Sequence, residues 1–222
     1  DYEENKTLDM EIKKNDLFDI FIEDMSEEGE GIGKIDGFTL FVKDAVVGDL
    51  VEAKILKPKK NYAYARLEKV LEPSPFRVTP KCTFHRQCGG CQLQHVAYAR
   101  QLAYKADKVK NCLSRIGGIP MEELEQIMEP IIGMEAPYYY RNKAQYPITL
   151  VGGKHRVGFF APKSHRVTPI SDCPLTPLVF SEICDELCAF FDENSVSVYD
   201  EESGKGLLRH IYLRRGEISG EI

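Results

Sequence analysis

The sequence lacks any long apolar run. Its 222 residues contain no stretch approaching the ~18 consecutive apolar residues that a membrane-spanning helix needs, which excludes a transmembrane helix, and we expect no membrane partner. The first residues are acidic and polar, without an apolar leader, so we expect no signal peptide and a cytoplasmic location. An initiator Met is also missing, and the sequence stops at Glu221-Ile222 within a strand-like pattern. We therefore expect a fragment of a longer protein.

The net charge of −6 is unevenly distributed. Residues 1–30 carry 12 acidic and 3 basic groups, residues 31–120 carry 16 basic and 7 acidic groups, and the remainder is acidic again. The basic middle block suggests a polyanionic partner that the pI of about 5.5 conceals. A solvated charged surface is the alternative interpretation.

Residues 10–72 show the pattern of a small barrel. Alternating apolar residues around Ile20, the Asp36-Gly37 turn, and strand patterns over Leu50–Leu56 and Tyr62–Val70 predict five short strands. Prolines at 73, 75 and 80 then predict a domain boundary.

Residues 73–222 mix helix and strand signals. An apolar stripe predicts a helix over residues 96–116, and Gly152-Gly153 predicts a hairpin turn. Arg166–Ile170 could add a third strand. Thr176 is a candidate N-cap for a second helix, with Pro177 at its first position. Leu207–Arg215 and Glu217–Ile222 have the pattern of a final hairpin.

Seven cysteines without a secretory signal favour metal binding or catalysis over disulfides. Cys82, Cys88 and Cys91 lie within ten residues on a glycine-rich loop, and Cys173 is the best candidate for a fourth ligand. This set favours an iron–sulfur cluster, while a zinc site that uses His85 or His95 stays open. For Cys184 and Cys188, four apart on an apolar helix face, core packing is the better interpretation.

The same cysteine loop resembles that of RNA uracil-5-methyltransferases of the TrmA/RumA type. The resemblance spans nearly the whole chain, and residues ~10–72 resemble a TRAM domain, an OB-like RNA-binding barrel. It rests on the following segments: Cys82-x5-Cys88-Gly89-Gly90-Cys91-x2-Gln94-His95, Tyr98-x2-Gln101-Leu102-x2-Lys105, Tyr140-Arg141-Asn142-Lys143, Gly158-Phe159, Asp172-Cys173-Pro174, Gly29-Glu30-Gly31-Ile32-Gly33 and Gly48-Asp49.

This resemblance implies that Cys82, Cys88, Cys91 and Cys173 hold a [4Fe–4S] cluster. It also implies that the parent enzyme uses a Cys thiolate to attack C6 of a uracil and transfers methyl from S-adenosylmethionine (SAM) to C5. The family's SAM fold and catalytic residues lie beyond the end of this chain. We therefore expect the SAM-binding Rossmann-like domain to be absent, no catalytic residue to be present, and the chain to be inactive alone.

RNA contacts are predicted where basic and aromatic residues alternate, because phosphates and unpaired bases bind such surfaces. Tyr62 or Tyr64 could instead fill the barrel core, and Arg141 and Lys143 could pair with acidic residues. The candidate RNA-binding residues are Lys54, Lys57, Lys59, Lys60, Tyr62, Tyr64, Arg66, Arg141 and Lys143.

The predicted fold class is mainly β with α: a five-stranded OB-like TRAM barrel at 10–72, followed by an α+β iron–sulfur RNA-binding domain at 73–222. The helix over 96–116 is expected to pack on the missing C-terminal methyltransferase domain. The predicted function is RNA recognition within a SAM-dependent 23S rRNA (uracil-5-)-methyltransferase, as a monomer. The alternative is a stand-alone iron–sulfur or zinc RNA-binding protein without catalysis.

Overall fold

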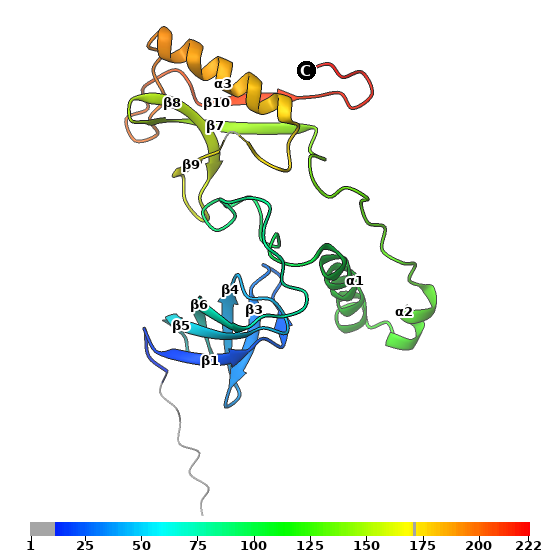
Figure 1. Cartoon of the computed structure of the whole chain (residues 1–222). Coiled ribbons are helices and arrows are strands. Elements are labelled where there is room, and N and C mark those ends of the chain that lie inside the picture. The colour runs from blue at the N-terminus through cyan, green and yellow to red at the C-terminus, as the bar shows by residue number, and fades with distance from the viewer. Residues whose placement is uncertain (1–11, 171) are drawn as a thin grey trace, which may run out of the picture. The chain divides into compact units, whose positions relative to one another are not determined.

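The computed structural model describes residues 12–170 and 172–222, and they divide into two compact units (Figure 1). The first unit extends to Val78 and also includes residues 95–97. The second unit contains residues 79–94 and 98–222. The acidic segment 1–11 lies outside the described residues.

The first unit is a six-stranded sheet in the order β1-β5-β6-β4-β3-β2, in which β4 and β6 pair in parallel and all other neighbours are antiparallel. One strand more than expected is present, because the two-residue β2 pairs with β3. The predicted Asp36-Gly37 hairpin is confirmed, with positive φ at both residues. The strands are β1 (Leu17–Phe21), β2 (Asp24–Met25), β3 (Gly31–Ile35), β4 (Phe38–Lys43), β5 (Leu50–Pro58) and β6 (Tyr62–Glu72).

The glycine run in β3 lets the barrel close tightly. A Cβ atom on Gly33 would lie 2.4 Å from the carbonyl oxygen of Phe21, and one on Gly31 would lie 2.8 Å from the Ile22 side chain. Strand β3 can therefore approach β1 only without side chains at these two positions.

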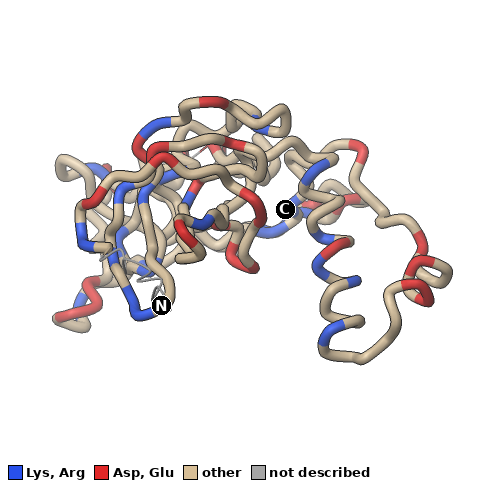
Figure 2. The backbone as a smooth tube through the Cα atoms, turned by 90° about the horizontal axis from the view of Figure 1, so that it is seen from below, with Lys and Arg blue, Asp and Glu red and all other residues tan. Residues whose placement is uncertain are grey.

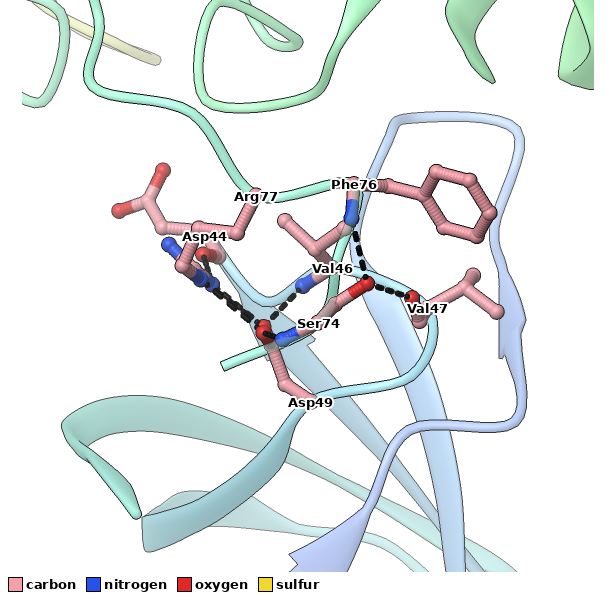
Figure 3. Close-up of polar contacts among 7 residues, drawn as sticks. All are labelled: Asp44, Val46, Val47, Asp49, Ser74, Phe76 and Arg77. Atoms are coloured by element: carbon pink, nitrogen blue, oxygen red, sulfur yellow. Dashed lines mark hydrogen bonds and ion pairs between the residues drawn. The ribbon is translucent and has the colours of Figure 1, made fainter. Parts of the chain in front are cut away.

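The segment after β6, residues 73–78, is called the strap here, and Asp49 binds it to the barrel (Figure 3). The fully buried Asp49 carboxylate accepts hydrogen bonds from the backbone N–H groups of Val46 and Ser74, at 2.7 and 2.8 Å. It also pairs with Arg77, whose Nη2 lies 2.5 Å from Oδ2 and donates again to the Asp44 carbonyl. This network explains why the first unit extends beyond residue 72.

The second unit contains a four-stranded antiparallel sheet in the order β10-β7-β8-β9, and α3 covers one face of it (Figure 1). Phe180, Cys184 and Cys188 of α3 form a core with Tyr146 and Ile211 of the sheet. The predicted turn at Gly152-Gly153 is confirmed. The elements are α1 (Tyr98–Arg115), α2 (Met121–Ile127), β7 (Lys143–Val151), β8 (Lys154–Phe160), β9 (Val167–Pro169), α3 (Leu178–Glu193) and β10 (His210–Arg214).

Two local predictions are corrected. The C-terminal segment forms no hairpin with β10, because β10 pairs with β7 and residues 216–221 form a turn closed by Gly216 N–H and the Glu221 carbonyl at 2.9 Å. Thr176 does not cap α3, since Pro177 is the N-cap and the Thr176 hydroxyl donates to the Cys173 carbonyl instead.

Helix α1 packs against α2, which the sequence pattern did not predict, and a Lys110–Glu125 ion pair at 3.6 Å joins the two. Figure 2 shows mainly basic residues along α1 and acidic ones along α2. In the part of the chain that the structure describes, no α1 residue is buried, and Val109 of the predicted stripe is 52% exposed. What covers this stripe stays a prediction.

Candidate nucleic-acid interface and cysteine site

Three aromatic rings form a cluster on the outside of the barrel. Phe41 of β4 and Tyr62 and Tyr64 of β6 have ring centroids 5.6 to 5.7 Å apart. The intervening Ala63 and Ala65 are buried in the core, so neither tyrosine fills the barrel. Tyr64 is 38% exposed, which leaves part of its ring available to a ligand.

Basic side chains surround this cluster. Lys57 lies across from Tyr64 on the adjacent strand, and Lys59 and Lys60 are exposed in the β5–β6 turn. Lys54 is half-buried across from Arg66. Arg66 itself is held by Glu68, with Nε and Nη2 at 2.8 and 2.6 Å from the same carboxylate oxygen.

Acidic residues border the cluster as well. The pKa of Tyr64 is raised, first by Tyr62 and further by the charges of Glu30 and Glu28.

The four candidate cysteines lie in two separate segments of the second unit. Cys82, Cys88 and Cys91 lie in the loop 79–94, and Cys173 precedes α3; all four are half-buried. Burial is the main cause of the raised pKa values of Cys82, Cys88 and Cys173, and Cys91 raises all three further.

Backbone N–H groups point at three of these sulfurs in a repeated pattern. Each donor is two residues further along the chain: Phe84 for Cys82, Gly90 for Cys88 and Leu175 for Cys173. The Gly90 nitrogen lies 3.3 Å from the Cys88 Sγ. These hydrogen bonds lower the pKa of each thiol and favour the thiolate, which is the form that binds metal.

Arg141 and Lys143 lie in different surroundings. The charge of Arg141 lowers the pKa values of Cys88 and Cys173. Lys143 lies on the open face of the sheet, with Nζ 5.4 Å from the ring centroid of the exposed Tyr212. The contacts that the structure describes for Arg141 and Lys143 include no ion pair with an acidic residue.

The other cysteines lie apart from this group. Cys184 and Cys188 are buried in the α3 core, and burial raises the pKa of Cys184 to about 12. Cys112 is half-buried on α1. The Cys184 and Cys188 thiols serve packing, as expected.

Within residues 12–170 and 172–222, no group of three or more His, Cys, Asp and Glu side chains is arranged as a site for a metal ion. The same residues include no helix long and apolar enough to cross a membrane.

Comparison with known families defines the class of the first unit. Residues 13–67 match the model of the TRAM domain, so the barrel with its outward aromatic cluster is a TRAM domain.

The chain as a whole is homologous to RNA methyltransferases. A protein of Clostridium tetani, described as an uncharacterized RNA methyltransferase, is 44% identical over 214 residues, covering 96% of this chain and 45% of that protein. A Clostridium acetobutylicum protein of the same description is 42% identical over 211 residues, covering 95% and 45%. This chain therefore spans about half the length of the curated relatives it matches.

A solved structure has a similar fold. It is the Pyrococcus abyssi tRNA (uracil-54, C5)-methyltransferase in complex with S-adenosyl-L-homocysteine. The match has a TM-score of 0.62 and 25% sequence identity, and it covers 90% of this chain and 43% of that chain.

These findings correct the expectation that this chain lacks the SAM-binding domain and is inactive alone. That expectation was based on where the sequence stops, and it is wrong. The similarity to methyltransferases extends over nearly the whole chain, and one of them was solved with S-adenosyl-L-homocysteine. A non-catalytic role therefore does not follow.

Sequence reasoning missed two groups of residues. Asp49 was noticed only as part of a turn, yet it ties the strap to the barrel through Arg77. Thr168 gave no signal, and Thr176 was predicted as a helix cap rather than as a partner of the Cys173 carbonyl; both side chains are buried. The available sequence signal for the Asp49–Arg77 contact was an aspartate at a barrel turn, followed by a distant arginine.

Proposed function

We propose that this chain binds RNA as part of a SAM-dependent RNA (uracil-5-)-methyltransferase. The observation that carries the proposal is the similarity of nearly the whole of this chain to RNA methyltransferases, together with the TRAM domain at residues 13–67. Within the proposal, the barrel surface contacts RNA and the cysteine site helps to shape the second unit.

RNA binding is assigned to the aromatic cluster and its lysines. An unpaired base would stack on the exposed ring of Tyr64, while Lys57, Lys59 and Lys60 contact phosphates. Four such phosphate contacts, including one from Lys54, would give a log–log salt slope of about −3 for single-stranded RNA.

Fluorescence anisotropy with a single-stranded RNA at several salt concentrations tests this assignment. Replacing Lys57, Lys59 and Lys60 by Ala should flatten the slope and weaken binding almost independently of sequence. The matched control replaces Lys163 and Lys205, exposed lysines of the second unit, and should leave the slope unchanged. Unchanged affinity in the triple variant would reject the barrel surface as the RNA site.

The substrate is proposed to be a uracil in 23S rRNA. The relative with a solved structure acts on tRNA, so both RNAs must be measured. In cells whose gene for this protein is deleted, mass spectrometry should show 5-methyluridine lost from 23S rRNA. Loss from tRNA alone would replace the ribosomal substrate with tRNA. Unchanged 5-methyluridine in both would refute the methyltransferase proposal and favour a non-catalytic RNA-binding protein.

We further propose that Cys82, Cys88, Cys91 and Cys173 hold a [4Fe–4S] cluster. The donor chemistry supports the proposal, because the four side chains are thiols and three of them accept backbone hydrogen bonds, which iron–sulfur ligands commonly do. When bound, such a cluster would supply either a structural brace or electron transfer. The chain's own part is to hold four thiolates within a half-buried site.

Anaerobic purification with iron and sulfide analysis tests the cluster. The protein should be brown, with broad absorbance near ~400 nm, and each of the four Cys→Ser variants should lose iron. Cys184→Ser is the matched control and should keep it. Zinc in place of iron and sulfide would favour the alternative metal, and neither metal would refute the site.

A further inference from the structure

The proposed cluster site combines two segments that are about 80 residues apart in the chain. Binding one cluster requires that these two segments be held at a fixed distance from each other. The structure shows a buried threonine hydroxyl at each segment. The inference that follows rests on the proposed cluster site.

Thr168 fastens the three-cysteine loop. This β9 residue is 1% exposed, and its hydroxyl donates to the carbonyl of Gln87, next to Cys88, at 3.1 Å. The same loop is held again by the Gly89 N–H, which donates to the Phe160 carbonyl at 2.9 Å.

Thr176 fastens the segment that carries the fourth cysteine. It is 2% exposed, and its hydroxyl donates to the Cys173 carbonyl at 3.1 Å. The hydroxyl of the fully buried Tyr146 donates in turn to the Thr176 hydroxyl, also at 3.1 Å. Cys173 is thereby connected to the centre of strand β7.

Valine has nearly the same shape as threonine and is the cheaper choice in a buried position, because an interior hydroxyl is costly without a partner. At both positions the hydroxyl is bonded to a carbonyl of, or next to, a cysteine. We propose that Thr168 and Thr176, the latter supported by Tyr146, are positioning residues that hold the two cysteine segments at the spacing one cluster requires.

The test replaces each hydroxyl while keeping the side-chain shape. Thr168→Val and Thr176→Val should lose the ~400 nm absorbance of the reconstituted protein several-fold faster in air than the wild type, because exposed clusters are more labile. Tyr146→Phe should have a smaller effect, and Ser at either threonine position should restore the wild-type lifetime. Thr149→Val, on the half-buried part of β7, is the matched control and should behave as wild type.

A second measurement is independent of iron. Phenylarsine oxide bridges two neighbouring thiols, which lose their protons as two As–S bonds form and water leaves. Its affinity for the cluster-free protein should fall in both valine variants. If the wild type forms no cluster, the cluster proposal fails while this titration still tests positioning.

Equal cluster lifetimes and equal arsenical affinities in wild type and both valine variants would overturn the inference. A drop in melting temperature alone, with both readouts unchanged, would show that the hydroxyls serve only folding and would overturn it equally.

Discussion

Removing the Asp49 carboxylate should destabilise the TRAM barrel more than any other single polar substitution described here. The carboxylate accepts hydrogen bonds from four donors: Val46 N, Ser74 N, and Arg77 Nε and Nη2, the last two at 3.0 and 2.5 Å. The Arg77 side chain is 18% exposed, so Asp49→Ala leaves a largely buried cation without its partner.

The magnitude follows from these contacts. Breaking a buried ion pair by removing one partner costs about 3–5 kcal/mol, and each stranded N–H adds to that only partly, because the losses overlap. Against a typical domain stability of about 5–15 kcal/mol, the variant should approach unfolding. At roughly 4–8 °C per kcal/mol, its melting temperature should fall by at least about 12 °C.

The pH dependence has a definite sign. Burial alone raises the pKa of Asp49, but the hydrogen bonds from Arg77, Ser74 and Val46 outweigh burial and hold it below the ordinary value of 3.8. The stabilisation is therefore fully present above 3.8 and is lost as the pH falls through the lower folded-state pKa. Asp49→Asn should lack this part of the acid sensitivity.

Hydrogen exchange followed by mass spectrometry locates the effect. In Asp49→Ala, protection should fall in the barrel and in residues 74–78. Arg66→Met removes an exposed ion pair on the same barrel and should cost less than about 1 kcal/mol. The double variant Asp49→Ala/Arg77→Met should be more stable than the sum of the single losses predicts, since no buried charge is stranded. Wild-type stability and protection in Asp49→Ala would refute the reasoning.

Three further predictions concern other parts of the chain. Gly33→Ala should destabilise the barrel, because its Cβ would overlap the Phe21 carbonyl, and a melting curve compared with Gly37→Ala at an open turn position checks this. Cys184→Ser should lower the melting temperature without changing RNA affinity, since it places a hydroxyl in the α3 core; lost RNA affinity in a folded variant would contradict this. The backbone and ring hydrogen bonds of His155 lower the pKa of Asp192, so this contact should weaken as the pH falls through the lowered value. Lower protection factors at residues 154–157 at acid pH, after correction for the intrinsic exchange rate and absent in Asp192→Asn, measure it.

Local signals predicted the turns and the two long helices, α1 and α3, well. Asp36-Gly37 and Gly152-Gly153 adopt positive φ at both residues, which a two-residue hairpin requires whatever surrounds it. Helix α1 was visible because its apolar stripe repeats over many turns. Such features depend on neighbouring residues alone.

Features that depend on distant partners could not be predicted. Strand β10 pairs with β7, more than sixty residues earlier, and no local pattern distinguishes this from pairing with the next segment. The short helix α2 spans seven residues, too few for a clear periodic signal, and it depends on packing against α1. Cys173 was the best candidate for a fourth ligand from the sequence, and the family resemblance implied the same residue, but its position relative to the cysteine loop stays a prediction.

Strand β6 shows why the candidate RNA surface needed the fold. The alternation Tyr62-Ala63-Tyr64-Ala65 fixes that the tyrosines share one face, but hydrophobicity alone would place the larger rings inside. The barrel interior at this point is already filled by Leu40 and other branched side chains, so only a methyl group fits there. The tyrosines are therefore forced outward, where they meet Phe41 and the lysines of the neighbouring turn. A tight core thus produces an exposed aromatic platform, and Tyr64→Ala should cost ~1–3 kcal/mol of RNA binding while the barrel keeps its melting temperature.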